Sequence, residues 1–321
     1  MANSIGAIRR LAEQKEIDAV LFSSILNASL SIPLRKHLAK HGVATAAIAY
    51  GLDATAPVWP YPNLVRKIFR TVDLILPISG ATGIECRARG LPPEKCEVVT
   101  LGIKLDRFMP PSSRADAKRH LANRFISDTK APPRLILSSV GRLIPRKGVA
   151  WFVNNVMPTL PADVHFLIAG EGQERARIEN AIATHGLHDR VRLLGAVSES
   201  DLSLLYQGSD LFVMPNVPIA GDMEGFGLVM LEAGLSGAPV IASRLEGILD
   251  VITEGENGHL VESGNAEKFR MAIMSYYENP DALRRASENA RAHTVSRFSW
   301  AGVTDKYVRL LSALVDKRRK H

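Results

Sequence analysis

The chain has 321 residues, enough for two domains that each bury an apolar core. Its formal net charge of +7 favours anionic partners. Because it has no nucleic-acid-binding motif and few aromatic residues between its cations, we exclude nucleic acid and retain anionic substrates and membrane surfaces. Its two cysteines, Cys86 and Cys96, exclude a disulfide framework and lack the spacing of metal ligands.

No apolar run reaches the length that a bilayer-spanning helix needs. The first twenty residues contain scattered charges and lack the apolar core of a signal peptide. We therefore expect a cytoplasmic protein, with peripheral contact to the inner face of a membrane left open. Homo-oligomerisation is also left open.

Residues 1–128 are predicted to alternate between helices and strands, which is typical of a parallel sheet covered by helices on both faces. Only four strands can be counted in this part. The predicted helices are 5–15, 26–41, 64–70 and 81–89, and the predicted strands are 19–22, 44–50, 74–76 and 98–99.

A composition shift at 128–134, DTKAPPR, predicts a linker. Residues 135–297 then repeat the alternation more strongly, and several strands end at glycine-containing turns, where open α/β sheets bind ligands. A final amphipathic helix is predicted within 298–321. The predicted strands of this half are 135–140, 164–169, 191–194, 210–214, 239–242 and 259–261, and its predicted helices are 174–185, 202–207, 228–233 and 266–278.

The stretch 214–242 joins a strand end, an acidic loop, a short helix and the next strand. A helix start carries unpaired N–H groups and partial positive charge, and the glycines beside it let an anion approach the backbone. Glu224 precedes this start, and Glu232 follows eight positions later, a little over two helical turns away. Carboxylates accept hydrogen bonds from hydroxyls. The combination predicts a ligand with both phosphate and hydroxyl groups, such as a nucleotide sugar.

A second candidate is the basic loop 141–148, GRLIPRKG, which follows a strand and precedes a helix. Flanking glycines with an arginine fork and a lysine point charge suit a diphosphate. The residues alone leave open which of the three cations, Arg142, Arg146 and Lys147, would hold it. The alternative is an ordinary solvated loop.

These motifs resemble retaining GT-B glycosyltransferases of family 4. The resemblance is carried by Glu224-Gly225-Phe226-Gly227, followed by Glu232-Ala233 and by Gly237-Ala238-Pro239-Val240, which look like the family's Glu–seven–Glu motif, and by the basic loop 141–148. It implies an α/β fold with two Rossmann-like domains facing a cleft: an acceptor-side domain at 1–128, a nucleotide-sugar domain at 135–297, and a helix at 298–321 that packs back on the first domain.

The resemblance also implies roles for individual residues. Glu224, the catalytic candidate, would contact the donor sugar together with Gly225 and Phe226, whereas Glu232 would hold the ribose. The backbone of Gly227 and Leu228 would join Arg142 and Lys147 at the diphosphate. Val197, in a turn near the nucleotide base, would contact that base. No cofactor and no metal are expected.

The N-terminal half departs from the family pattern. Segments 17–20 and 47–53 resemble the middle of the family's first domain, so its opening strands are expected to be absent and the domain shortened. Tyr50 stands where many relatives have a histidine before glycine. Segment 57–70 mixes aromatic residues with cations. It is interpreted as a core-facing helix with a basic outer side, or alternatively as a contact with a membrane surface.

We therefore expect an enzyme that transfers a hexose from a UDP- or GDP-sugar to a hydroxyl of a sugar or lipid-linked acceptor, with retention, in cell-envelope polysaccharide or glycolipid synthesis. The first alternative is a nucleotide-sugar-binding partner subunit, or an inactive relative, that needs another chain for catalysis. A second alternative is an epimerase that acts on a nucleotide sugar without an acceptor.

Overall fold

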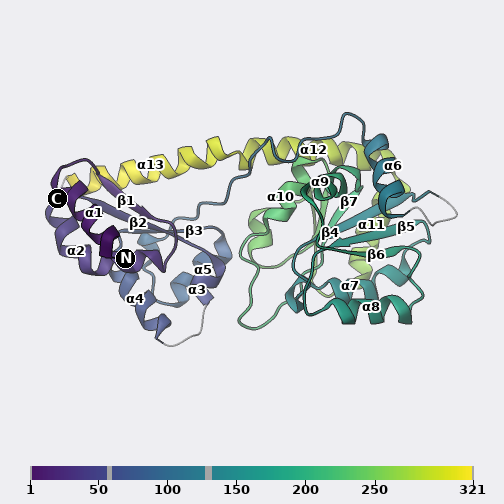
Figure 1. Cartoon of the computed structure of the whole chain (residues 1–321), viewed down its shortest axis with the longest axis horizontal. Coiled ribbons are helices and arrows are strands. Elements are labelled where there is room, and N and C mark those ends of the chain that lie inside the picture. Colours follow the sequence, from purple (N-terminus) through teal and green to yellow (C-terminus); the bar gives the residue numbers. More distant parts are fainter. Residues whose placement is uncertain (1, 56–59, 127–131, 320–321) are drawn as a thin grey trace. The chain divides into compact units, whose positions relative to one another are not determined.

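The computed structural model describes residues 2–55, 60–126 and 132–319. These residues form two compact units (Figure 1). Unit 1 contains the described residues of 1–102 and 300–321 together with 220–226, and unit 2 contains those of 103–219 and 227–299. The chain thus leaves unit 1 at Gly102, ahead of the expected linker at 128–134, of which residues 128–131 lie outside the described residues.

Unit 1 contains a sheet whose described strands are parallel and arranged in the order β1-β2-β3. The expected fourth strand at 98–99 is wrong. Val99 donates its backbone N–H to Pro77 at 2.9 Å, but only one isolated bridge, Ile75 to Cys96, joins this segment to the sheet. A single bridged pair of residues does not form the continuous hydrogen-bonded ladder of a strand. The strands are β1 (Ala19–Phe22), β2 (Ala44–Ala49) and β3 (Leu74–Pro77).

Helices cover this sheet and supply its core. The last helix packs Val303 against Ala46, Leu74 and Leu76 of the sheet. Among the described residues, no helix combines the length and the apolar content that crossing a bilayer requires. Residues 57–59 of the expected aromatic and basic segment lie outside the described residues. The helices are α1 (Ala2–Glu13), η1 (Asn27–Leu30), α2 (Ser31–Lys40), α3 (Gly51–Thr55), α4 (Tyr61–Thr71), α5 (Gly80–Ala88), η2 (Pro93–Lys95) and α13 (Trp300–Arg319).

Unit 2 contains a parallel sheet whose described strands follow the order β6-β5-β4-β7-β8-β9. Strands β5 and β6 are added on one side of β4, and β7, β8 and β9 follow on its other side. The strand order therefore reverses between β4 and β7, which is the point where doubly wound sheets bind their ligands. The strands are β4 (Leu135–Val140), β5 (Val164–Ala169), β6 (Val191–Gly195), β7 (Leu211–Met214), β8 (Val240–Ser243) and β9 (Gly258–Val261).

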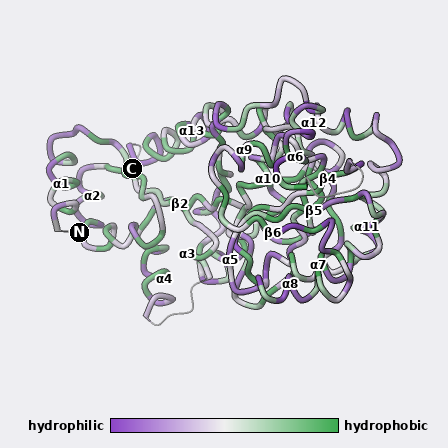
Figure 2. The backbone as a smooth tube through the Cα atoms, turned by 45° about the vertical axis from the view of Figure 1, so that its right-hand side comes forward, coloured by the Kyte–Doolittle hydropathy of each residue, from purple (hydrophilic) through white to green (hydrophobic). Residues whose placement is uncertain are grey.

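The central strands of unit 2 are almost entirely buried, and Figure 2 shows their hydrophobic character along β4 and β5. Continuous apolar strands are expected where helices cover both faces of a parallel sheet. The helices are α6 (Arg114–Phe125), η3 (Pro145–Lys147), α7 (Val149–Asn155), η4 (Met157–Thr159), α8 (Arg175–Thr184), α9 (Glu199–Gly208), α10 (Leu228–Leu235), η5 (Glu246–Asp250), α11 (Ala266–Glu278) and α12 (Pro280–Phe298).

Helix α12 was not predicted from the sequence. Its buried face consists of Ser287, Ala290, Thr294 and Phe298, which form only a weak apolar stripe. Small residues are used there because the helix packs closely on α10. A Cβ atom added to Gly234 would lie 2.6 Å from Thr294 Oγ1. The position of α12 is therefore determined by its close contact with α10 and not by a periodic apolar stripe.

Helix α6 was also missed, and it belongs to unit 2 although it precedes the expected linker. Few of its residues are apolar and buried. Instead, Arg114 donates to the backbone carbonyls of Ser209 at 2.6 Å and Ser236 at 3.1 Å. Burial lowers the pKa of this guanidinium. A polar anchor of this kind leaves no periodic apolar signal in the sequence.

Candidate functional site at the switch point of the second sheet

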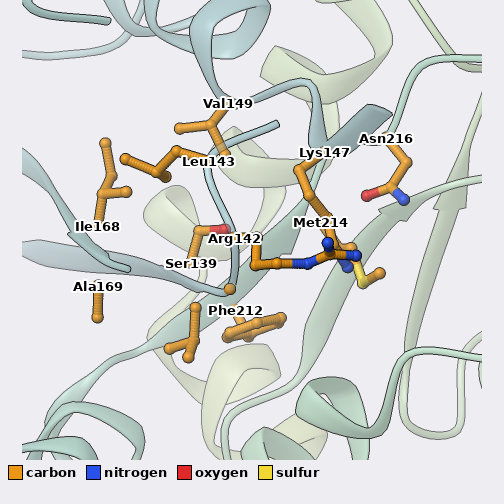
Figure 3. A pocket seen from close by; sticks show the side chains of 12 residues that line it. Ser139, Arg142, Leu143, Lys147, Val149, Ile168, Ala169, Phe212, Met214 and Asn216 are labelled. Carbon is orange, nitrogen blue, oxygen red and sulfur yellow. The ribbon is translucent and has the colours of Figure 1, made fainter. Parts of the chain in front are cut away.

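A pocket lies at the carboxyl ends of β4 and β7, between which the strand order of unit 2 reverses (Figure 3). Both cations that were assigned to the diphosphate line it, so the structure brings Arg142 and Lys147 together. The lining residues are Ser139, Val140, Gly141, Arg142, Leu143, Lys147, Val149, Ile168, Ala169, Phe212, Met214 and Asn216.

The loop after β4 is held in place by its contact with the loop after β7. Gly148 has a left-handed backbone with φ of +65°, and a Cβ atom there would lie 1.9 Å from the carbonyl oxygen of Pro215. The backbone N–H of Val217 donates to the carbonyl of Arg146 at 3.0 Å. Only glycine allows this approach, and the contact fixes the ends of both strands against each other.

The three cations of the basic loop have different environments. Arg142 is exposed and makes no ion pair with any described residue, and Lys147 is half-buried. Figure 3 shows that the side chains of Arg142 and Lys147 extend toward one another across the pocket. Arg146 is instead buried, with 6% of its surface exposed, and does not line the pocket. Two converging like charges are an arrangement that a bound anion stabilises.

Helix α10 begins beside this pocket. Its N-cap is Gly227, with φ of +91°, and no side chain caps its first N–H groups. A Cβ atom on Gly227 would lie 3.1 Å from Cε of Met214, a pocket residue, and 2.7 Å from Cε of Met230. Leu228 is 42% exposed although it is a large apolar residue. The helix thus starts with uncapped donors next to the pocket, which is the arrangement expected for anion binding.

Glu232 lies on α10 and is held by a buried tyrosine. Its carboxylate has 16% of its side-chain surface exposed and accepts a 2.8 Å hydrogen bond at Oε2 from the hydroxyl of Tyr206. Arg107 Nη1 lies 3.8 Å from Glu232 Oε1. Burial, followed by the charge of Glu232, raises the pKa of Tyr206 well above its usual value. Tyr206 therefore stays a neutral donor at physiological pH.

The other part of the acidic motif groups with unit 1. Glu224 is buried with 7% of its surface exposed, Phe226 is 3% exposed, and both belong to the segment 220–226. Within that unit, a Cβ atom on Gly51 would lie 3.2 Å from Cα of Gly225. This contact lies next to Tyr50, which is 37% exposed.

The remaining predicted site residue, Val197, does not line the pocket. It is half-buried after β6 and packs on an apolar cluster that includes Ile136, Leu167 and Leu205. Among the described residues, no group of three or more His, Cys, Asp and Glu side chains has the arrangement of a metal site.

Sequence reasoning assigned no role to Tyr206, Arg107 or Asn216. Arg107 lies far from Glu232 in the sequence, so no local signal linked the two residues. Tyr206 offered none, because its contact with Glu232 joins residues 26 positions apart on different helices. Asn216 is fully buried and lies two residues after the end of β7.

The sequence profile described as glycosyl transferases group 1 matches residues 122–293, more than half of the chain. The lipopolysaccharide core biosynthesis glycosyltransferase LpsE of Rhizobium meliloti (strain 1021) is 28% identical over 283 residues, which are 88% of this chain and 80% of LpsE. The phosphatidyl-myo-inositol mannosyltransferase of Mycobacterium leprae (strain TN) is 32% identical over 178 residues, 55% of this chain and 46% of that protein. The chain thus spans between about half and four fifths of these two relatives.

The fold is similar to that of Anabaena Alr3699/HepE, whose crystal structure is a complex with UDP and glucose. The TM-score is 0.74 at 19% identity, and the match covers 96% of this chain and 80% of HepE. The chain has the GT-B fold, with its parallel sheets and covering helices. On the strength of the family match, the chain belongs to the glycosyl transferases group 1 family.

Proposed function

We propose that this chain transfers a hexose from a UDP- or GDP-sugar to an acceptor hydroxyl with retention of configuration. The observation that carries this proposal is the convergence of Arg142 and Lys147 on one pocket at the switch point of the sheet, beside the uncapped start of α10. Arginine, lysine and backbone donors are suited to a diphosphate leaving group. Membership of the glycosyl transferases group 1 family supports the reaction class.

In the proposed site, Arg142, Lys147 and the backbone of Gly227 and Leu228 bind the two phosphates. Glu232 accepts hydrogen bonds from the ribose hydroxyls, because carboxylate oxygens accept several hydrogen bonds and the hydroxyl of Tyr206 holds this carboxylate in one orientation. Val197 contacts the base through its turn. No metal ion is required in this proposal, because the cations and the helix start neutralise the diphosphate.

For the sugar end, we assign Glu224, Gly225 and Phe226 to the hexose. The bond between the anomeric carbon and the phosphate oxygen breaks, and a new bond forms to the acceptor oxygen. The acceptor proton passes to the departing diphosphate oxygen. Attack on the same face as the departing group gives retention without an enzyme nucleophile. The diphosphate gains charge as it leaves, so its fixed donors stabilise the transition state more than the ground state.

The acceptor class is proposed from the relatives. One is named for lipopolysaccharide core biosynthesis and another as a phosphatidyl-myo-inositol mannosyltransferase. We therefore propose a sugar or lipid-linked acceptor in cell-envelope polysaccharide or glycolipid synthesis, used at the inner face of the membrane. The net charge of +7 suits an anionic surface of this kind.

A second candidate function is nucleotide-sugar binding without catalysis by this chain alone. Tyr50 favours it. A tyrosine hydroxyl is a poor substitute for the imidazole that relatives are expected to have at this position.

Turnover distinguishes these candidates. The purified full chain is incubated with UDP- and GDP-hexoses, with and without sugar and lipid-linked acceptors, and the released diphosphate and the anomeric configuration of the product are measured. Acceptor-dependent release with retention supports transfer. Saturable donor binding without turnover, whatever the acceptor, supports the second candidate. Conversion of the donor sugar without acceptor identifies an epimerase and contradicts both.

A further inference from the structure

Unit 1 contains a second polar pocket, which we call the amino-end pocket. It lies where β2 and β3 begin, between α2, the end of α4, η2 and α13. Its volume is about 230 Å³. The lining residues are Ser31, Arg35, Leu38, Ala39, Val43, Thr45, Arg70, Thr71, Asp73, Lys95 and Arg318.

The charge of this pocket is strongly positive. Four cations, Arg35, Arg70, Lys95 and Arg318, line it together with one carboxylate, Asp73. Arg35 and Arg70 are exposed, and neither makes an ion pair with a described residue. Cations gathered around one hollow repel one another, and that repulsion is relieved by an anion.

The single carboxylate is already occupied by structural contacts. Asp73 Oδ2 accepts 2.9 Å hydrogen bonds from both the backbone N–H and the hydroxyl of Thr45, and its Oδ1 accepts from Arg318 at 2.5 Å. Asp73 thus fixes the start of β2 and the end of α13, and it does not neutralise Arg35 or Arg70.

Lys95 is a half-buried cation of the pocket. Its ammonium donates to the carbonyls of Val72 at 2.7 Å and Phe69 at 3.3 Å, which offsets the negative end of α4 and leaves a third N–H for a ligand. Burial lowers the pKa of Lys95, and the charges of Arg35 and Arg318 lower it further, against the opposing effect of Asp73 and Glu94. A bound anion would relieve this electrostatic stress.

A neighbouring depression continues the basic surface. It shares Asp73, Lys95 and Arg318 with the amino-end pocket and adds Lys317, Glu94 and the apolar side chains of Leu74 and Leu314. The two hollows together contain five cations and two carboxylates. The carboxylates that line the two hollows are therefore too few to neutralise the cations beside them.

The position of the pocket separates it from substrate binding. Open α/β sheets bind their substrates at the carboxyl ends of the strands, whereas Thr45 and Asp73 stand at the amino ends of β2 and β3. We propose that the amino-end pocket binds a phosphate monoester or diester group, supplied by a soluble phosphate compound or by a phospholipid headgroup. This site is independent of the proposed transfer reaction.

The test titrates the full chain with inorganic phosphate as the probe. Binding is measured from the backbone amide NMR signals of Thr45 and Thr71. These local signals report on the amino-end pocket even when phosphate also enters the pocket of unit 2. The variant Arg35→Ala with Arg70→Ala removes two cations that make no ion pair in the described structure, so the fold is retained. Its control is Arg66→Ala with Lys67→Ala, which removes the same charge from the exposed side of α4.

We expect saturable shifts of both amides in the parent, a roughly tenfold or greater weakening in the Arg35/Arg70 variant, and little change in the Arg66/Lys67 control. Absence of saturable shifts, or equal weakening in the two variants, would overturn the proposal. Donor titration of the Arg35/Arg70 variant should match that of the parent, so failure here is distinguishable from failure of the proposed function.

Vesicle binding identifies the source of the phosphate. The same proteins are sedimented with vesicles of phosphatidylcholine alone and with vesicles that also contain phosphatidylglycerol. Loss of binding to the anionic vesicles in the Arg35/Arg70 variant, but not in the control, assigns the pocket to a headgroup. Equal vesicle binding by both variants, together with the phosphate result above, assigns it to a soluble compound.

Discussion

The hydroxyl of Tyr206 donates a 2.8 Å hydrogen bond to Glu232, linking α9 to α10 at the acidic residue proposed to hold the ribose. Tyr206 is fully buried and its ring packs edge-on against Phe108, with centroids 5.1 Å apart. The tyrosine is therefore a rigid support that orients one carboxylate oxygen of Glu232, while Arg107 lies 3.8 Å from the other oxygen. We regard it as a positioning residue.

Replacing Tyr206 with phenylalanine keeps the ring packing and removes only this donor. We expect the free energy of unfolding to fall by about 1–2 kcal/mol and donor affinity to fall several-fold, because Glu232 is no longer held in one orientation. Calorimetric titration with the nucleotide diphosphate measures the second effect. The matched control is Tyr277→Phe, which removes a similar 2.9 Å bond to Asp163 elsewhere in unit 2. Equal affinity in the Tyr206 variant and the parent would show that Glu232 needs no support.

Arg142→Ala should weaken donor binding roughly tenfold or more, since a charge-assisted contact with a phosphate is lost. The fold should be unaffected, because Arg142 is exposed and makes no ion pair in the described structure. The control is Arg177→Ala on α8, whose side chain is 73% exposed and pairs only with Glu174. A similar loss in both variants would assign the effect to overall charge and not to the pocket.

The close approach of the two strand-end loops predicts an effect on stability. In Gly148→Ala the new Cβ meets the carbonyl of Pro215 and the backbone keeps a positive φ, so we expect a loss of about 3 kcal/mol or more in urea unfolding. Gly186→Ala has a similar φ of +61° but nothing within 4 Å, and should lose only about 1 kcal/mol. If the two losses are equal, the contact with Pro215 is not tight.

His165 makes stability depend on pH. It is a buried residue of β5, and burial, with the nearby charges of Arg190 and Arg192, lowers its pKa below the usual 6.5. Between the folded and unfolded pKa values the unfolded chain binds more protons, so stability is present above pH 6.5 and is lost as the pH falls below it.

Denaturant unfolding of the parent and of His165→Asn, compared from about pH 7.5 to about pH 5, tests this dependence. The free energy of unfolding should fall more steeply in the parent, because asparagine does not titrate. The comparison of slopes removes the contribution of the other groups. Identical slopes would mean that His165 is not responsible.

The strands of both sheets could be predicted from the sequence because buried parallel strands are largely apolar runs, as in β3 and β7. The basic loop and the start of α10 were also predictable, since glycines and charges follow strand ends there. Helix α12 was not, because its buried Ser287, Ala290 and Thr294 form no apolar stripe. The strand predicted at 98–99 was wrong. Two consecutive valines favour a strand, but they do not show whether a neighbouring strand pairs with them along a ladder.

Within the candidate site, the sequence identified the groups that follow a motif and missed those that depend on long-range packing. Arg142 and Lys147 were identified by the resemblance of the basic loop to the family motif, and both line the pocket. Arg146, between them in sequence, is buried in η3 and does not line the pocket. Tyr206 reaches Glu232 only through the packing of α9 on α10, which no local pattern encodes.

The central claim is that unit 2 binds a nucleotide sugar by its diphosphate, and calorimetric titration of the purified chain with UDP and GDP tests it most directly. We predict that one of the two binds in a one-to-one complex and that Lys147→Ala and Glu232→Ala each weaken it roughly tenfold or more. The Arg177→Ala control should bind like the parent. If neither nucleotide binds, or if both site variants bind as tightly as the parent, the site has been assigned to the wrong ligand.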